Sequence, residues 1–182
     1  MMLQLPPKTF CLIRHGETSA NRDGIIAGAH DVDLTDKGRK QAEALRETEW
    51  PTATMLFASP KRRAQDTCAL AFPDAPFHTQ SDLRERDWGI FEGLPITQLP
   101  PRDGKPEGGE DWGEMQRRVA SAISEGCALA QDLLPIFVCH SGVIRATRIL
   151  AGQSNVGARP HNAQPIYFEW TGREHKEIYD VE

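Results

Sequence analysis

The sequence predicts an α/β fold, in the form of a three-layer α/β/α sandwich around a mostly parallel central sheet. Short apolar runs alternate along the chain with longer segments of helical periodicity, which is typical of strands joined by crossover helices. Three of the apolar runs lead into basic or histidine residues, and such folds bind ligands at the carboxyl ends of their strands. The 182 residues, 39% of them hydrophobic, suffice for one core and are short for two, so 1–182 is predicted to form a single domain.

Six short runs, most of them apolar, are predicted to form strands. They are Phe10–Ile13, Met55–Ala58, Phe77–Gln80, Pro135–Cys139, Ile166–Trp170 and Glu177–Val181. The last two flank Thr171-Gly172, which predicts a turn between them. Cys139 lies next to His140, but alternation along a strand points the two side chains apart, so Cys139 is predicted to be a core residue and not a nucleophile.

Four segments are predicted to be helices from their spacing and their ends. They run from the cap Thr35 to about Glu47, from Arg62 to Ala71, from Asp111 to about Leu133, and from Gly142 to Leu150. The third carries apolar residues at helical spacing, which predicts a helix packed on the core. The stretch from Asp82 to Glu110 is rich in Pro and Gly and is predicted to be irregular, and long irregular segments are usually functional.

The most informative motif, Arg14-His15-Gly16, follows the first predicted strand. A guanidinium binds phosphate oxygens through forked hydrogen bonds, an imidazole can attack phosphorus, and glycine lets the backbone approach closely. The motif therefore predicts phosphoryl transfer through a histidine. Because an isolated histidine is more often a buried structural residue, this interpretation needs partners elsewhere in the chain.

Two further strand ends supply such partners. Arg63 follows the second strand at the start of a helix, and His140 follows the strand Pro135–Cys139. Helix N-termini attract anions, and the parallel strands would deliver these residues to one edge of the sheet. Arg63 is preferred over Arg62 because of its spacing to Ser59, and Arg62 is expected on a solvated helix face.

With these motifs the chain resembles the histidine phosphatase superfamily, which includes cofactor-dependent phosphoglycerate mutase. The resemblance runs from Leu12 to about Leu150, in the family's order of motifs, and extends to its short phosphatase branch, which includes an α-ribazole phosphatase. It implies a phosphoglycerate mutase-like fold and a phosphorylated His15. It further implies that four side chains bind the phosphoryl oxygens, namely Arg14, Asn21, Arg63 and His140.

The resemblance also implies a proton donor. The segment Leu83–Gly93 matches the family's segment whose first glutamate protonates the leaving group, so this role is assigned to Glu85 and not to Glu92. Fixed cations stabilise the charge on a transferring phosphoryl group, while an acid protonates the leaving alkoxide and later takes a proton from water. The predicted function is hydrolysis of a phosphomonoester of a small metabolite through a phosphohistidine, with no metal or other cofactor.

Other interpretations stay open. The family's mutases are longer around the active site, whereas here the segment 94–110 is the available short cap; an open site favours hydrolysis. Phosphoglycerate mutase-type transfer and a non-catalytic phosphate-binding module are the alternatives. A metal site built from two histidines and a glutamate is opposed by the nearby arginines, which would repel a divalent cation.

Several polar residues also have a plainer interpretation. Glu85 could belong to a charged surface loop, and Asn21 could be an ordinary loop or cap residue. Arg117 and Arg118 are expected to be solvated or bonded to local carboxylates. Lys105 and Arg102, in the cap, are expected to keep a loop solvated in preference to binding a second anionic group.

Composition limits the cellular location and the binding partners that the protein can be expected to have. A net charge of −5 argues against general binding of nucleic acid or membrane surfaces. The first eight residues contain no long apolar run, which predicts a cytoplasmic protein. Four widely spaced cysteines without Cys-x-x-Cys pairing are expected to be reduced. The expected partner is a small phosphorylated metabolite, and the sequence leaves the oligomeric state open.

Overall fold

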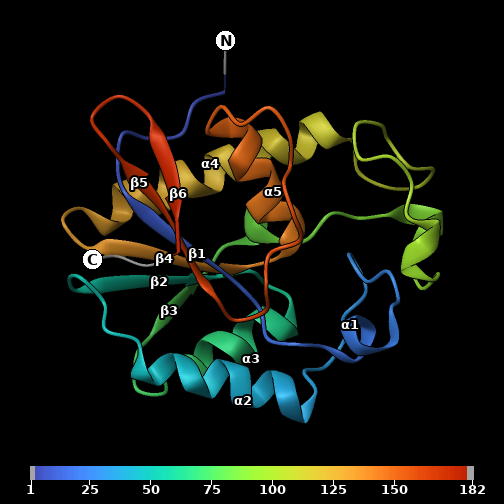
Figure 1. The fold of residues 1–182 in the computed structure, drawn as a ribbon, viewed down its shortest axis with the longest axis horizontal. Helices are drawn as coiled ribbons and strands as arrows, with labels where there is room; N and C mark the ends of the chain where they lie inside the picture. The colour runs from blue at the N-terminus through green and yellow to red at the C-terminus, as the bar shows by residue number, and fades with distance from the viewer. Residues whose placement is uncertain (1–2, 180–182) are drawn as a thin grey trace.

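A computed structural model describes residues 3–179, and a six-stranded sheet runs through this part of the chain (Figure 1). Its strands are β1 (Phe10–Arg14), β2 (Thr54–Ala58), β3 (Phe77–Thr79), β4 (Leu134–Cys139), β5 (Pro165–Trp170) and β6 (His175–Ile178). Their order is β3-β2-β4-β1-β5-β6, with β1 to β4 parallel and β5 and β6 antiparallel to their neighbours. The mostly parallel sheet is confirmed.

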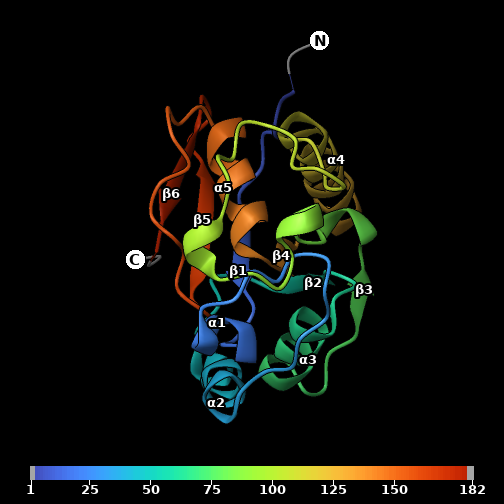
Figure 2. The same ribbon diagram turned by 90° about the vertical axis from the view of Figure 1, so that its right-hand side faces the viewer.

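Helices cover both faces of this sheet. They are α1 (Ser19–Asp23), α2 (Asp36–Ala44), α3 (Arg62–Ala71), α4 (Trp112–Ala130) and α5 (Ser141–Leu150). Short 3₁₀ turns are η1 (Leu45–Glu47), η2 (Ser81–Leu83), η3 (Gly89–Phe91) and η4 (Ile96–Gln98). Helices α2 and α3 lie on one face and α4 and α5 on the other, which confirms the predicted three layers (Figures 1 and 2). None of the helices within 3–179 is long and apolar enough to cross a membrane.

Strand β1 shows why its sequence is apolar without interruption. Phe10 and Leu12 point into the core beneath α4 and α5, whereas Cys11 and Ile13 point into the core on the side of α2 and α3. All four side chains are completely buried. A strand covered on both faces must be apolar at every position, and this is the pattern of a central parallel strand. Cys139 is likewise a buried core residue, as predicted.

Some predicted element ends were wrong. The last strand was expected at Glu177–Val181 but begins at His175 and ends at Ile178, and the predicted positions 180 and 181 lie outside the described residues. Helix α4 ends at Ala130, short of Leu133, because Gln131 takes a positive φ of 50°. The helix capped by Thr35 ends as α-helix at Ala44 and continues through Glu47 only as the 3₁₀ turn η1.

The carboxyl ends of β1, β2 and β4 meet at one edge of the sheet. Arg14 pairs with Cys139 in the register, and Ala58 pairs with Val138. The next residue of each strand, namely His15, Ser59 or His140, therefore emerges at this edge. Figure 2 looks onto it and shows the yellow-green segment that follows Asp87 passing across it. The predicted irregular stretch 82–110 forms this covering, with three short 3₁₀ turns.

Candidate active site

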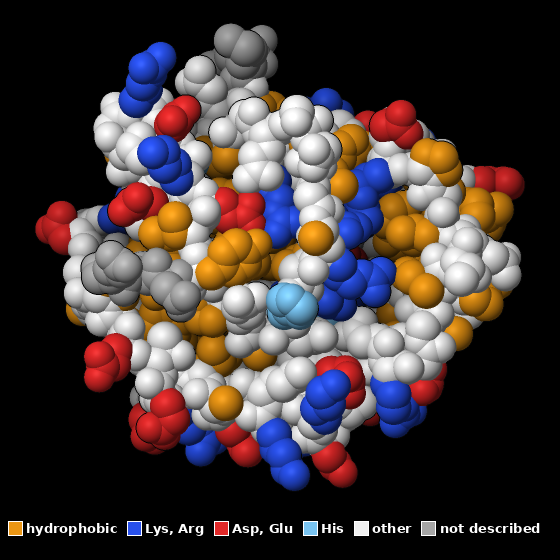
Figure 3. Space-filling view, in the orientation of Figure 1, with side chains coloured by type: hydrophobic (Ala, Val, Ile, Leu, Met, Phe, Trp, Pro, Cys, Tyr) orange, Lys and Arg blue, Asp and Glu red, His pale blue; other side chains and the backbone are white. Residues whose placement is uncertain are grey.

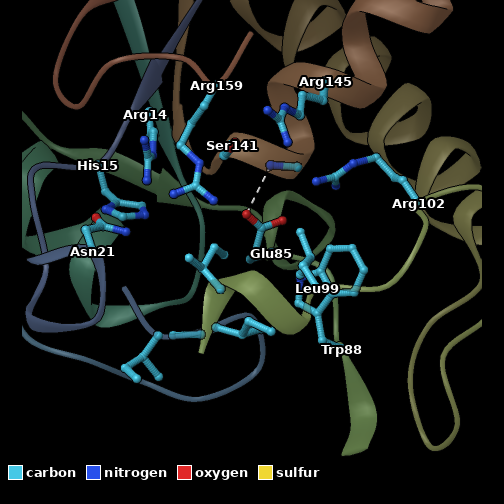
Figure 4. A pocket seen from close by; sticks show the side chains of 15 residues that line it. Arg14, His15, Asn21, Glu85, Trp88, Leu99, Arg102, Ser141, Arg145 and Arg159 are labelled. Atoms are coloured by element: carbon cyan, nitrogen blue, oxygen red, sulfur yellow. Dashed lines mark hydrogen bonds between the residues drawn. The ribbon is translucent and has the colours of Figure 1, made fainter. Parts of the chain in front are cut away.

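A cavity of about 60 Å³ opens at this edge, between the loop after β1, helix α5 and the covering segment (Figure 4). Of the predicted site residues, Arg14, His15, Asn21 and Glu85 line it. His140 and Arg63 stand behind its wall: each is fully buried, and the charge of Arg63 acts on both histidines. The parallel strand ends thus bring together residues that lie up to 125 positions apart in the sequence, from His15 to His140.

The imidazole of His15 is held in one orientation and one tautomer. Its Nδ1 lies 2.7 Å from the Gly16 carbonyl oxygen, which can only accept, so Nδ1 carries the proton. The other ring nitrogen, Nε2, is left with its lone pair. Burial of the ring, followed by the charges of Arg63 and Arg14, lowers the pKa of His15 well below 6.5. At neutral pH His15 is therefore an uncharged imidazole whose Nε2 carries no proton.

The loop that carries His15 packs against α2. A Cβ atom at Gly16 would lie 2.3 Å from the Gly38 carbonyl oxygen, so no other residue fits there without displacement. The Gly16 N–H donates to Thr67 Oγ1 at 3.0 Å. The glycine of the motif was interpreted as allowing a close approach of the backbone, and in the structure this close approach is to α2.

His140 lies behind His15, with ring centroids 5.2 Å apart. Its Nε2 is 2.7 Å from Ser59 Oγ, and its buried Nδ1 has no hydrogen-bond partner among the described residues. Burial, and then the charge of Arg63, lowers the pKa of His140 well below 6.5. A buried ring nitrogen without a protein partner is unusual.

Arg14 and Asn21 present further donors to the cavity. Arg14 Nη1 donates to the Pro160 carbonyl at 2.7 Å, while its buried Nε has no partner within the described chain. Burial and the nearby Arg159 lower the pKa of Arg14 to about 10. Asn21 closes a capping box with Thr18 at the start of α1, a short helix that sequence periodicity did not reveal. Its Oδ1 accepts from the Thr18 N–H at 3.1 Å, so Asn21 caps the helix as one interpretation expected, and it also lines the cavity.

Arg63 differs from the expectation. Its guanidinium donates to the backbone carbonyls of Ala27, Gly28 and His30 at 3.3, 2.9 and 2.8 Å, and the side chain does not line the cavity. Sequence spacing located Arg63 near the strand ends but could not show that the 27–30 loop would engage its donors. Arg62, expected on a solvated helix face, is exposed and pairs with Asp33 at 3.0 Å.

Glu85 reaches the cavity from the covering segment. Its Oε1 accepts from the Arg86 N–H at 2.8 Å, and its Oε2 accepts from the Gly142 N–H at 3.0 Å, at the start of α5 (Figure 4). A Cβ atom at Gly142 would lie 2.1 Å from Glu85 Oε1, so the glycine makes room for the carboxylate. The surface-loop interpretation of Glu85 is therefore wrong.

Two neighbouring side chains fix this arrangement. Arg118 donates to the carbonyls of Asp82 and Arg84 at 2.7 and 2.8 Å and pairs with the carboxylate of Glu110. It was expected to be solvated or bonded to local carboxylates, and the second alternative holds. Glu92 accepts the N–H groups of the 28–29 turn and of Trp88, and it does not line the cavity. Its geometry agrees with the choice of Glu85 over Glu92.

Three more arginines line the cavity: Arg102, Arg145 and Arg159. The preferred interpretation of Arg102 as a residue that keeps a loop solvated was wrong, whereas Lys105 is exposed. Arg145 lies on α5 five residues after His140, a spacing that could have indicated it. Arg159 lies in the irregular stretch before β5, where no pattern in the sequence marks it.

Within residues 3–179, no three His, Cys, Asp or Glu side chains cluster closely enough to hold a metal ion. The groups gathered at the cavity are instead cationic side chains, amide and imidazole donors, and one acid on a loop. Open α/β sheets bind ligands at such an edge, and cationic donors of this kind suit a ligand that carries a phosphate group.

Comparison with known proteins agrees. Residues 10–177 match the family model of the histidine phosphatase superfamily (branch 1), and the chain belongs to this superfamily. It is similar to the metal-independent phosphoserine phosphatase of Arabidopsis thaliana, with 30% identity over 174 residues, 84% of this chain and 72% of that protein. It is also similar to a probable phosphoglycerate mutase of Salmonella paratyphi C, with 32% identity over 147 residues, 71% of this chain and 67% of that protein.

A solved structure supports the same fold. The product of an open reading frame of Mycobacterium tuberculosis superposes with a TM-score of 0.83 at 25% identity, covering 94% of this chain and 95% of that one. Phosphatase-named relatives of this superfamily support a phosphatase, while mutase-named relatives show that the family name alone does not decide the reaction.

The buried neutral histidines predict a pH dependence of stability. As the pH falls through about 6.5, the unfolded chain takes up a proton at His15 that the folded protein excludes, so the free energy of unfolding decreases. His15→Asn should make the free energy of unfolding depend less steeply on pH, by roughly 1.4 kcal/mol per pH unit well below pH 6.5. Urea unfolding between neutral and mildly acid pH measures it.

The matched control is His78→Asn, because His78 is exposed on the edge strand β3. It should retain the slope of the wild-type protein. An unchanged slope in His15→Asn would show that His15 is not held neutral by the fold.

Proposed function

We propose that the protein is a phosphatase that hydrolyses a phosphomonoester of a small metabolite through a phosphohistidine on His15, without a metal ion or other cofactor. The observation that carries this proposal is the His15 imidazole, which is neutral and has its free Nε2 in a cavity with cationic side chains. The segment 94–110 serves as a short cap of a single domain. A cytoplasmic location is part of the proposal and is supported by four buried free thiols.

Donors around His15 bind the phosphoryl oxygens. Arg14 contributes its guanidinium and Asn21 its side-chain N–H₂, whose oxygen is already engaged by Thr18. Ser59 Oγ accepts from the Lys61 N–H, so its own hydrogen is free to donate to His140 Nε2. Neutral His140 then carries its proton on Nδ1, the buried nitrogen without a protein partner, and donates it to a phosphoryl oxygen. Arg63 contributes its charge to the same site from behind the wall.

In the first half reaction, the lone pair of His15 Nε2 forms a bond to phosphorus while the bond from phosphorus to the ester oxygen breaks. Glu85 gives its proton to that oxygen, and the alcohol leaves. The phosphorylated ring keeps its Nδ1 proton, and the Gly16 carbonyl stabilises the positive charge that the ring acquires. Preorganised donors stabilise the spreading negative charge without reorganisation.

In the second half reaction, the Glu85 carboxylate takes a proton from water as the water oxygen bonds to phosphorus. The bond from phosphorus to Nε2 breaks, and its electron pair returns to the imidazole, so inorganic phosphate and neutral His15 are restored. Two backbone N–H groups, of Arg86 and Gly142, hold the carboxylate in position for both proton transfers.

Phosphoglycerate mutase-type transfer is the second candidate, and the similarity to a probable mutase favours it. A mutase must shield the phosphohistidine from water. The cap that this chain offers is a single short segment, which Arg86 fixes by donating to the carbonyls of Arg102, Gly104 and Glu110. Phosphate release distinguishes hydrolysis from both mutase transfer and mere phosphate binding.

Replacement of the nucleophile tests the proposal. His15→Ala should abolish phosphate release from p-nitrophenyl phosphate and also the acid-labile labelling of the protein by a radioactive phosphomonoester, because no other group replaces Nε2. The assay is run with and without a chelator, and release by the wild-type protein should be insensitive to it. His78→Ala, on the exposed edge strand, should keep full activity. Substantial phosphate release by His15→Ala would show that His15 is not the nucleophile.

Glu85→Gln tests the proton donor. Glutamine keeps an oxygen that accepts a backbone N–H but cannot protonate a leaving alkoxide. In the first turnover, before the phosphohistidine is hydrolysed, we expect release of the alcohol from an alkyl phosphate to fall by about 10²- to 10⁴-fold. First-turnover release of p-nitrophenolate from p-nitrophenyl phosphate should fall far less, because p-nitrophenolate leaves without protonation. The control is Glu107→Gln at an exposed position of the cap, and equal losses on both substrates would mean that Glu85 only positions other groups.

A further inference from the structure

The arginines that are buried in the fold have hydrogen-bond partners for their guanidinium groups. Arg63, Arg86, Arg118 and Arg148 are all buried, and each guanidinium donates to several backbone carbonyls or to a carboxylate. Arg148, for example, binds the Glu177 carboxylate and the carbonyls of Val156 and Ala158. Burial of a guanidinium without such partners is costly, and this explains the pattern.

Two arginines of the cavity that are partly buried depart from this pattern. Neither Arg102 nor Arg145 has a side-chain hydrogen bond or an ion pair with any residue in the described part of the chain, and the Nε of Arg145 is buried. Both are partly shielded from solvent. Their donors converge on the cavity from the cap and from α5, which are far apart in sequence. Figure 3, in the orientation of Figure 1, shows Lys and Arg side chains gathered near the middle of the face it draws, beside hydrophobic ones.

Both arginines lie at the end of the cavity away from the nucleophile. In Figure 4, His15, Arg14 and Asn21 occupy one end, whereas Arg102 and Arg145 occupy the other. Glu85 stands between the two ends. Since Glu85 protonates the ester oxygen in the proposed mechanism, the remainder of the leaving alcohol extends toward Arg102 and Arg145.

The charges at the far end repel one another. The pKa of Arg145 is lowered to about 10 by burial first and then by the positive charges of Arg102 and Arg159. The pKa of Arg102 is also lowered, mainly by burial. Among the described residues that line the cavity, Glu85 is the single carboxylate, and its two oxygens already accept backbone N–H groups. An anion bound between the two guanidinium groups would relieve this repulsion.

At the far end of the cavity, packing against aromatic rings holds a guanidinium in place. The guanidinium carbon of Arg102 lies 5.2 Å from the ring centre of Trp88 and 5.5 Å from that of Trp112, within the range of cation–π contacts. Trp88, Leu99 and Ile96 also give the cavity an apolar wall. This wall suits a carbon skeleton that links a phosphoryl group at one end to an anionic group at the other.

We infer that Arg102 and Arg145 form a second anion site, and that the substrate is a phosphomonoester whose alcohol portion carries a carboxylate or a second phosphate. This inference rests on the proposed function for the direction of the leaving group. Glu85 separates the two sites, so the reacting phosphoryl group occupies the His15 end while the second anion anchors the leaving group.

Binding of phosphonates tests the inference without turnover, because their carbon–phosphorus bond is not hydrolysed. Alkylphosphonates of graded chain length, ending in methyl, carboxylate or a second phosphonate, are titrated into the protein by calorimetry. At the best chain length, a charged end should raise the affinity by about 10- to 100-fold over methyl. Comparison of the carboxylate and phosphonate ends shows which anion the site takes.

Arg102→Gln, Arg145→Gln and the double variant should each reduce this affinity ratio, with the double variant approaching a ratio of one. Arg173→Gln, in the exposed turn between β5 and β6, is the matched control and should keep it. No preference for charged ends at any chain length would overturn the inference, as would a preference that survives the double substitution. An equal loss for charged and methyl ends would also contradict it, because a merely structural role lowers both.

His15-dependent hydrolysis of p-nitrophenyl phosphate is measured in parallel. If hydrolysis persists while no preference for charged ends exists, the second anion site is wrong and the phosphatase function stands. If the preference exists but no ester is hydrolysed, the anion site stands and the proposed function is wrong.

Discussion

The hydrogen bond from His15 Nδ1 to the Gly16 carbonyl is the contact on which the proposed chemistry depends. It assigns the proton to one ring nitrogen and leaves the other, the nucleophile of our proposal, unprotonated. Its geometry depends on Gly16, which packs against Gly38 of α2 too closely for any side chain. The strand register then places His140 and Ser59 at the same level, because β4 pairs with both β1 and β2. Sheet pairing and one tight loop contact together determine how the His15 ring is held at the edge of the sheet.

Arginine serves two purposes in this molecule, and its partners distinguish them. Arg63, Arg86 and Arg118 are buried and tie loops to one another through backbone carbonyls. Arg86 and Arg118 hold the segment that carries Glu85, so Glu85 is positioned by groups that do not line the cavity. Arg102 and Arg145, which line the cavity, lack such partners within the described residues, and their positive charge is available to an anionic ligand.

The sequence predicted the layers, the parallel sheet and the location of Arg14 and His15, because strand ends are marked by abrupt changes from apolar to charged residues. Asn21 and Glu85, which also line the cavity, were located only through the resemblance to the histidine phosphatase superfamily. Arg14 and His15 follow such an end directly, so their location depends only on the strand. The hydrogen-bond partners of the Arg63 guanidinium were not predictable, because they are backbone carbonyls of a loop 33 to 36 residues away in sequence. Arg102 was misjudged for a related reason: only the folded cap shows that Trp88 and Trp112 hold its guanidinium beside the cavity. The five-residue helix α1 is too short for periodicity to reveal.

The covalent intermediate is the central claim, and the stereochemical course at phosphorus tests it most directly. A phosphomonoester made chiral at phosphorus with oxygen isotopes is supplied together with an acceptor alcohol, and the configuration of the transferred phosphoryl group is determined. Two successive in-line displacements, one by His15 and one by the acceptor, should give overall retention. Overall inversion would mean a single direct displacement and would contradict a phosphohistidine on the reaction path.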